Sequence, residues 1–524
     1  MFFLVNRNKI DFDINNHTTQ VNNLITMFRE LSSNDENENG NNNNHNNNSI
    51  ESVGAMEDLD RPSKYRQALF VCTYIISMLS INSLPAVYNP MTDENILTAA
   101  TATQVVGFES YGIAFGKLCF GACSDMFGPR RVMGICFIVM TFLLFLFSFG
   151  SNMYFIALLA FTLEAANSSI WPSHICIVRG WYSKANTAEG TRLLGISSRG
   201  GAMLANGLYG ILLMLGMYWR SIIRYVTIPL CILGVVLSRF HRDTRSQADF
   251  IGEVASTEAW KKNAKIVLSA KDFWFTAISL GCCTVVKRMG VITPIFFYAT
   301  SKSIISVGDS VAMGIIYQLG LLCGTTVGGH YYAKLKKDHK AKALLLRKLN
   351  FLSTGCGISL GFFSLIAQNN SSGFMLFLEA TLAFLMAFGV STSYYVIPAL
   401  FSVVFGGEKR GGMVSAFLDC FGYLFTSTFL LLQKGIISSP LSWSGVWWLI
   451  AFFNFIVILL VQPLENILER LENSDDGSDN VVDEYYGKSE DQISLVNNYD
   501  AREEEANVND VRLSETDGKS SINL

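Results

Sequence analysis

The chain has 524 residues, of which 50% are hydrophobic and only 16% are charged, and its formal net charge is −3. This composition is too apolar for an ordinary soluble domain, and the small net charge excludes a general electrostatic attraction to nucleic acid. Both ends of the chain are polar, whereas residues 65–463 form a succession of apolar runs. The sequence therefore predicts an integral membrane protein that is surrounded by the lipid bilayer.

Residues 1–64 and 464–524 are predicted to be disordered tails. The first contains the Asn-rich run "NDENENGNNNNHNNNS", and the second is acidic. Neither tail can bury enough apolar surface to offset the entropy lost on folding. The second tail also contains "DQISLV" at 491–496, which resembles an acidic dileucine sorting signal, so sorting adaptors are candidate partners there.

The apolar region contains twelve runs that are long enough to cross a bilayer, for which a helix needs about 20 residues. The longest internal loop, 240–271, divides them into a first set at 65–239 and a second set at 272–463. We therefore predict an all-α membrane protein with twelve transmembrane helices in two pseudo-symmetric six-helix bundles, an arrangement typical of transporters. The predicted helices are 66–88, 98–120, 132–150, 153–178, 189–215, 219–239, 272–299, 307–333, 348–368, 373–405, 411–433 and 443–462.

The loops that are rich in Lys and Arg all follow even-numbered predicted helices. Because such loops stay on the cytoplasmic side of a membrane, both termini and the loop at 240–271 are predicted to be cytoplasmic. The pattern is compatible with the plasma membrane and with an organelle membrane alike. The basic loops are 129–131, 179–184, 240–265, 334–348 and 408–410.

The stretch "YGIAFGKLCFGACSDMFGPRR" at 111–131 ends the second predicted helix and starts the third. Its glycines permit close helix approach, its proline ends a helix, and its aspartate can cap a helix or pair with an arginine across a seam. Contacts of this kind can close and reopen, as a gate requires; alternatively, the arginines only anchor the loop in the cytoplasm. The candidate gating residues are Gly121, Asp125, Gly128, Pro129, Arg130 and Arg131, with Gly329 at the corresponding place in the second half.

The pattern GxxSDxxGPRR in this stretch resembles the loop signature of the major facilitator superfamily, and the resemblance extends over 66–463. A related run, "GTTVGG" at 324–329, ends the eighth predicted helix at the equivalent place. The resemblance implies a transporter whose substrate cavity lies between the two bundles and opens alternately to the two sides.

One lysine, Lys117, lies within the second apolar run. A charge at membrane depth costs several kcal/mol unless it faces a cavity or a partner, so Lys117 is a candidate functional residue. Its surroundings resemble the second helix of the organophosphate:phosphate antiporters, where a lysine faces the substrate. Arg288, in "VVKRMGVITPIFF", is similar to the arginine that binds the phosphoryl group in that branch. The adjacent Lys287 is expected to point away from the cavity.

The chain departs from that branch in its first helix, where the family has a second arginine. Here "ALFVCTYIISMLSINSLPAVY" carries no charge, and Asn82 is its only strongly polar residue. An arginine occurs instead in the fifth helix, as Arg199. Either the phosphate clamp has moved to Arg199 with Arg288, or the substrate carries less charge than a phosphate monoester, as an amino acid or organic acid does. The predicted substrate-binding residues are Lys117, Arg199, Arg288 and Asn82.

Carboxylates in the predicted helices could carry a coupling proton or form structural ion pairs. This leaves two alternatives to an antiporter of phosphorylated metabolites. One is a proton-coupled or facilitative transporter of amino acids, organic acids or drug-like solutes. The other is a membrane receptor or sensor that transports nothing. The carboxylates concerned are Glu109, Glu164, Glu379 and Asp419.

No phosphate-binding loop, zinc-protease motif or nucleophile elbow occurs in the sequence, so the chain is not expected to be an enzyme. The eleven cysteines are scattered, mostly inside apolar runs, and are expected to be buried small hydrophobic residues. No cofactor or metal is predicted.

Overall fold

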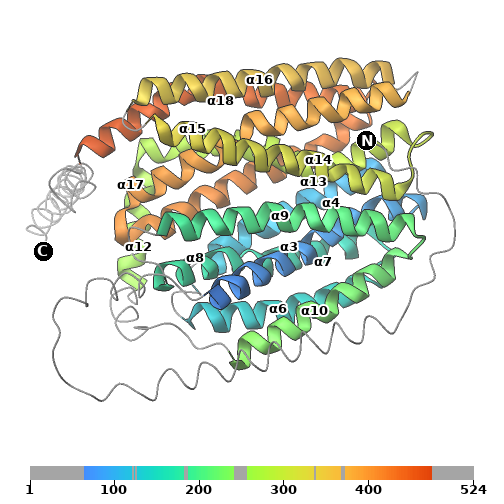
Figure 1. Ribbon diagram of the computed structural model, residues 1–524, viewed down its shortest axis with the longest axis horizontal. Coiled ribbons are helices and arrows are strands. Elements are labelled where there is room, and N and C mark those ends of the chain that lie inside the picture. Colours follow the sequence, from blue (N-terminus) through green and yellow to red (C-terminus); the bar gives the residue numbers. More distant parts are fainter. Residues whose placement is uncertain are drawn as a thin grey trace, which may run out of the picture. The chain divides into compact units, whose positions relative to one another are not determined.

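The computed structural model describes residues 64–120, 123, 127–181, 187–240, 257–335, 338–367 and 372–474. The chain divides into the units Met1–Asp60 and Arg61–Leu524, and the described residues all belong to the second. Their regular structure is entirely helical (Figure 1). The predicted N-terminal tail, up to residue 63, and the predicted C-terminal tail beyond residue 474 lie outside the described residues.

The helices follow one another along the chain with short connections. A π-helical turn, η2, interrupts the eighth predicted span between α14 and α15. In chain order they are α3 (Lys64–Asp93), α4 (Ala99–Phe120), α6 (Pro129–Phe147), α7 (Met153–Asn167), α8 (Ile170–Trp181), α9 (Thr187–Met214), α10 (Trp219–Phe240), α12 (Thr257–Ser269), α13 (Lys271–Ser301), α14 (Val307–Cys323), η2 (Gly324–Gly328), α15 (Gly329–Lys334), α16 (His339–Ala367), α17 (Gly373–Ile437) and α18 (Ser442–Ser474).

Ten helical stretches among the described residues are long and apolar enough to cross a membrane. The second and fifth predicted spans, which are helices α4 and α9, are not among these ten. These two helices carry the polar residues Glu109, Lys117 and Arg199. The prediction of a multi-pass helical membrane protein is therefore confirmed, whereas the count of twelve spans stays a prediction.

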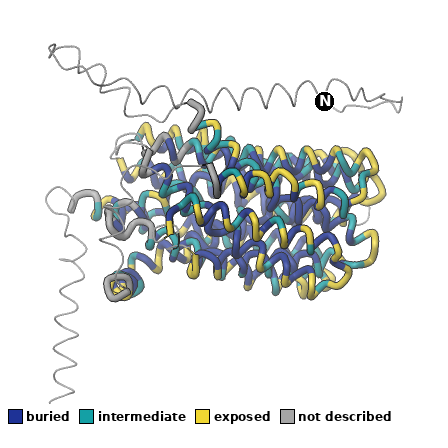
Figure 2. Tube along the Cα trace, turned by 90° about the horizontal axis from the view of Figure 1, so that it is seen from below, coloured by how far each residue is buried: buried dark blue, intermediate teal, exposed yellow. Residues whose placement is uncertain are grey.

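The outer faces of these helices carry large apolar side chains with no protein against them. Phe142, Leu158 and Phe377, on three different helices, are each about 60% exposed (61%, 61% and 62%). A soluble monomer rarely exposes so many such side chains, whereas lipid solvates them without penalty. Figure 2 shows the buried residues gathered in the interior of the bundle.

Several predicted boundaries are wrong. The ninth helix was predicted to start at 348, but α16 begins at His339, and the predicted tenth and eleventh helices form one continuous helix, α17. Two further differences have a physical explanation. The segment 240–271 was predicted to be a loop, but it contains helix α12, whose Ala264 and Val267 pack in a core cluster with Phe273 of α13. The tail was predicted to begin at 464, but α18 continues to Ser474 because Leu464 and Leu468 are buried. Apolar residues at helical spacing explain both differences, since one short apolar stripe stabilises a helix only when a partner covers it.

The helices pack in two groups: the first group is α3 to α10, and the second group is α12 to α18. Within the first group α4 packs on α7 and α6 packs on α10; within the second, α16 packs on α18 and α13 packs on α17 (Figure 1). Between the groups, α4 packs on α17 and α9 packs on α14. Glycine permits the closest approaches: a Cβ atom on Gly112 would come within 2.2 Å of the Phe161 carbonyl oxygen. Small residues at such positions let membrane helices approach closely.

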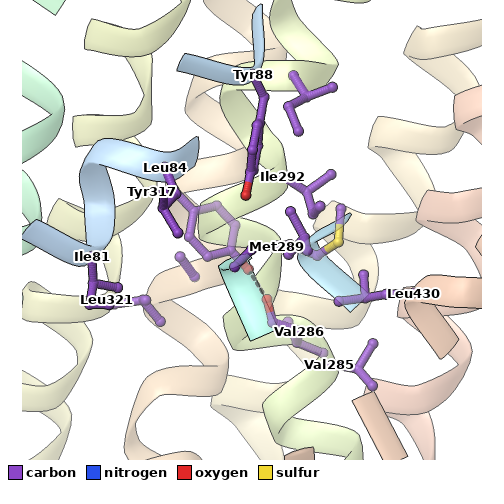
Figure 3. Close-up of a cluster of buried hydrophobic side chains, with 14 of the residues drawn as sticks. Ile81, Leu84, Tyr88, Val285, Val286, Met289, Ile292, Tyr317, Leu321 and Leu430 are labelled. Carbon is purple, nitrogen blue, oxygen red and sulfur yellow. Dashed lines mark hydrogen bonds between the residues drawn. The ribbon is translucent and has the colours of Figure 1, made fainter. Parts of the chain in front are cut away.

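An apolar cluster joins the two groups near the middle of the bundle (Figure 3). It brings Ile81, Leu84 and Tyr88 of α3 against residues of α13, α14 and α17. The Tyr317 hydroxyl donates a hydrogen bond to the Val286 carbonyl, which fixes α14 against α13. The cluster excludes water from the space next to the charged residues described below.

Candidate functional site

A cavity of about 220 Å³ lies between the two groups of helices. Its walls come from α3, α4, α7, α8 and α9 on one side and from α13, α14 and α17 on the other. All four predicted substrate-binding residues line it: Asn82, Lys117, Arg199 and Arg288. Of the predicted carboxylates, Glu164 and Asp419 line the cavity.

Lys117 is paired across the two groups. Its Nζ lies 2.9 Å from Asp419 Oδ2, and thus joins α4 to α17. The lysine side chain is 8% exposed and the aspartate side chain 25%, so the pair is only partly shielded from water. The positive charge of Lys117 is therefore compensated by a residue of the protein.

Arg288 is paired with two carboxylates at once. Its Nη2 lies 2.6 Å from Glu109 Oε2 and 3.3 Å from Glu164 Oε1, so that α13 is tied to both α4 and α7. The Tyr88 hydroxyl donates a short hydrogen bond to Glu109. Both glutamates are 1% exposed. This buried group holds one positive and two potential negative charges, and it links the two groups of helices.

Arg199 and Lys287 make no ion pair within the described part of the chain. Arg199 donates from Nη1 to Gln318 Oε1 at 3.1 Å, and its guanidinium lies 5.2 Å from the centre of the Tyr395 ring. The Arg199 Nε and the Tyr395 hydroxyl are buried without a hydrogen-bond partner among the described residues. Lys287 donates to the Tyr423 hydroxyl at 2.9 Å. Neither residue is paired with a carboxylate among the described residues.

The expectation that Lys287 points away from the cavity is wrong, because Lys287 and Arg288 both line it. Adjacent residues on a helix are about 100° apart, and a cavity that wraps around α13 accommodates both. Lys287 lies 5.3 Å from the ring centres of Tyr394 and Tyr423. Sequence reasoning also missed these tyrosines and Gln318, since uncharged polar residues inside an apolar run leave little pattern.

Asn82 and Glu379 take no part in the ion pairs described above. Asn82 lines the cavity and donates its amide to the carbonyl of Met78, one turn earlier on α3, at 2.7 Å. Glu379 does not line the cavity. It is completely buried, and neither of its carboxylate oxygens has a hydrogen-bond partner among the described residues.

The predicted gating residues are only partly described, because Gly121 and Asp125 lie outside the described residues. Gly128 has φ of +85°, a value that favours glycine, and it directly precedes Pro129 at the start of α6. Arg130 donates from Nε to the Leu237 carbonyl of α10 at 2.8 Å, within the first group of helices.

The two remaining gating candidates are Arg131 and Gly329. Arg131 is exposed, and a Cβ atom on Gly329 would meet nothing within 4 Å. A gating role for the set as a whole stays a prediction.

The end of the bundle opposite the basic loops is closed by contacts between the two groups. Asn89 of α3 donates to the Pro294 carbonyl at 3.0 Å and to the Ser310 hydroxyl at 2.8 Å. At the end of the same helix, Asp93 pairs with Lys302 at 2.7 Å. These contacts hold the two groups of helices together at that end.

A helical bundle with charged residues in a cavity between two groups of helices defines the chain as a membrane transporter. Residues 70–429 match the family model of the Major Facilitator Superfamily. The chain belongs to the Major Facilitator Superfamily. A comparison with curated protein sequences finds no match.

Several solved structures share this fold. A bacterial homologue of the human lysosomal transporter Spinster, inward-facing and unoccupied, aligns with a TM-score of 0.54 and 11% identity over 80% of this chain and 100% of that one. The inward-facing, occupied form of that homologue aligns with a TM-score of 0.55 and 11% identity over 79% of this chain and 98% of that one. A mutant of the nucleoside transporter NupG aligns with a TM-score of 0.55 and 14% identity over 76% of this chain and 99% of that one. At these identities the likeness shows the fold alone.

Proposed function

We propose that this protein is a secondary transporter of a small organic anion, which binds between Arg199 and Lys287 and crosses by alternating access. One observation carries the proposal. Of the four basic residues that line the cavity, Lys117 and Arg288 have carboxylate partners, whereas Arg199 and Lys287 have only neutral ones in the described residues. A bound anion would supply the missing charge.

The positions of these two residues connect binding with movement. Arg199 belongs to α9 in the first group of helices, and Lys287 belongs to α13 in the second. An anion that contacts both would draw the groups together, and its loss would remove that link between them. Binding energy of this kind favours reorientation of the loaded protein over the empty one, as exchange requires.

The cavity also limits the size and charge of the substrate. Its volume of about 220 Å³ lies below the roughly 300–1,000 Å³ typical of sites for drug-sized ligands. Because Lys117 and Arg288 are already compensated, the structure favours a solute with a single carboxylate over a doubly charged phosphate monoester. Exchange of a phosphorylated metabolite for phosphate, which the sequence resemblance implies, would require one of those pairs to open.

A proton-coupled mode is the second candidate, and the group formed by Glu109, Arg288 and Glu164 favours it. Two carboxylates share one guanidinium, so one negative charge is left over when both are ionised. A proton would neutralise that charge and weaken the link between α13 and one of its two partners. Asp419, partnered with Lys117, is another carboxylate at which protonation would loosen contact between the groups.

Counterflow in proteoliposomes tests the proposal. Vesicles preloaded with one unlabelled solute are offered the same solute in labelled form, across a panel of monocarboxylates, dicarboxylates, inorganic phosphate and sugar phosphates. We expect exchange of monocarboxylates, including amino acids. Exchange of phosphate and sugar phosphates alone would reject the single-charge version in favour of the antiporter that the sequence resembles. Exchange of no anion by protein that is folded would reject anion transport.

The orientation of the chain is also a proposal. Both termini would be cytoplasmic, which places the end closed by Asn89 and Asp93 on the non-cytoplasmic side. Single cysteines placed in the loops at 216–218 and 438–441 should be protected from an impermeant reagent that is added to the cytoplasmic face of the protein's membrane. Labelling of these cysteines from the cytoplasmic face would contradict the orientation.

A further inference from the structure

Glu379 is a buried carboxylate that the proposed transport cycle does not use. It lies on α17, six residues after the helix begins at Gly373, and it is 0% exposed. Both of its oxygens lack a hydrogen-bond partner among the described residues. The other three candidate carboxylates all have basic partners, so Glu379 differs from them in kind.

The packing of α16 on α17 indicates which part of α16 lies opposite Glu379. The two helices run antiparallel, because Asn350 contacts Ser393 at 2.6 Å and Ser353 contacts the Met386 carbonyl at 2.9 Å. Continuing this register by two turns brings Glu379 opposite the segment 361–364 of α16. Ser364 in that segment is fully buried, and its hydroxyl has no partner in the described part of the chain.

The pairing of α16 with α18 adds a second serine. Asn454 donates to Thr354 at 3.0 Å, and a Cβ atom on Gly361 would lie 2.2 Å from Trp448 Nε1. The next turn in this register sets Ser444 of α18 opposite Ser364. Ser444 is fully buried as well, and no described residue bonds its hydroxyl.

The last turns of α17 contribute a glutamine. Phe429 packs on Phe453 of α18, with ring centres 5.4 Å apart, and a Cβ atom on Gly445 would lie 2.9 Å from Ile436 Cγ2. Gln433 lies between these two contacts on α17 and therefore faces the same part of α18, which includes Trp447. Gln433 and the Trp447 indole are fully buried, and their polar side-chain atoms have no partners among the described residues.

No basic side chain of the described residues compensates Glu379. At this end of α13, α14, α16, α17 and α18 the described basic residues are Lys302, which pairs with Asp93, and Lys434, which is exposed. A buried carboxylate without a counter-charge is strongly unfavourable in a membrane bundle. The carboxylate must therefore be neutralised by a proton or by a bound cation.

The surrounding groups favour a cation. Oxygen ligands suit hard cations, and one carboxylate balances one positive charge. We propose that this cluster binds a small monovalent cation of the size of Na⁺. The carboxylate of Glu379, the hydroxyls of Ser364 and Ser444 and the carbonyl of Gln433 are its ligands, and all four side chains have polar atoms without a hydrogen-bond partner among the described residues. The Trp447 ring lies 5.0 Å from that of Phe296 on α13, the helix of Lys287 and Arg288, so the site is linked by packing to the cavity.

Thermal unfolding of the full-length protein in detergent tests the site without reference to any transported solute. Tm is measured in equimolar NaCl, KCl and choline chloride. We expect Tm in NaCl to exceed the other two by at least about 2 °C and to saturate as the NaCl concentration rises. Glu379→Gln should abolish the dependence on Na⁺.

A matched control is Glu465→Gln. Glu465 is also a fully buried carboxylate of the second group, but Tyr332 and His339 bond it, at 2.7 and 3.0 Å. This variant should keep the Na⁺ dependence. Should Glu379→Gln fail to fold, Ser364→Ala should raise the half-saturating NaCl concentration several-fold. Equal Tm values in the three salts for the wild-type protein would overturn the proposal, as would stabilisation by acid alone, which would indicate a protonated Glu379.

Discussion

Removal of Arg288 is the most informative structural perturbation. Arg288→Met keeps most of the side-chain volume but leaves Glu109 and Glu164 buried without their cation. Two unit charges 4 Å apart interact by about 4 kcal/mol at an effective dielectric constant of 20, and breaking a buried pair typically costs about 3–5 kcal/mol. We therefore expect Arg288→Met to lower the free energy of unfolding by about 4 kcal/mol.

The same reasoning predicts a rescue. Glu109→Gln and Glu164→Gln, added to Arg288→Met, remove the uncompensated charges and should restore most of the lost stability. The assay is thermal unfolding in detergent, followed for the wild type, the single variant and the triple variant under one set of conditions. A single variant as stable as the wild type would refute the view that Arg288 holds α4, α7 and α13 together. A triple variant no more stable than the single one would show that packing, and not charge, sets the cost.

Three further predictions follow from local contacts. Lys117→Gln and Asp419→Asn should each destabilise the protein by only about 1 kcal/mol, because the pair is partly exposed to water. The double variant should cost less than the sum of the two, because both single changes remove the same interaction. Additive costs in a double-mutant cycle would contradict the pairing. Gly128→Ala should cost about 1–2 kcal/mol, since only glycine adopts φ of +85° without strain, and an unchanged unfolding curve would contradict this. A Cβ atom on Gly116 would lie 2.3 Å from the Ala165 carbonyl oxygen, so Gly116→Ala should reduce the yield of folded protein, whereas Gly329→Ala, with nothing within 4 Å, should not.

Much of the architecture follows from the spacing of apolar runs. A run of about 20 apolar residues has few structures open to it in a bilayer other than a helix, so the main helices lie close to the predicted ranges. Helix α6 begins at Pro129, ahead of the predicted start at 132, because proline suits the first turn of a helix. Among the errors, those at α12 and at the end of α18 arose where helix formation depends on packing against distant residues such as Phe273.

The candidate site was predictable as a set of residues and not as a set of contacts. A single charged residue inside an apolar run is conspicuous because its burial in a membrane is costly. Lys117, Arg199 and Arg288 were predicted as site residues on that basis. Which carboxylate each would meet depends on helix packing across the two groups. Glu109 is separated from Arg288 by many helices in the chain, and nothing in either local sequence connects them. The Tyr423 and Gln318 contacts were missed for the same reason.

The central claim is that an anion binds between Arg199 and Lys287. The most direct test is counterflow of the transported anion by proteoliposomes that contain the wild type, Arg199→Gln or Lys287→Gln. Arg220→Gln serves as the control, because Arg220 pairs with Glu94 away from the cavity. We predict that each cavity variant loses at least about tenfold of the exchange rate, equivalent to about 1.4 kcal/mol, while the control keeps it. Exchange by Arg199→Gln and Lys287→Gln at the wild-type rate would contradict the proposed site.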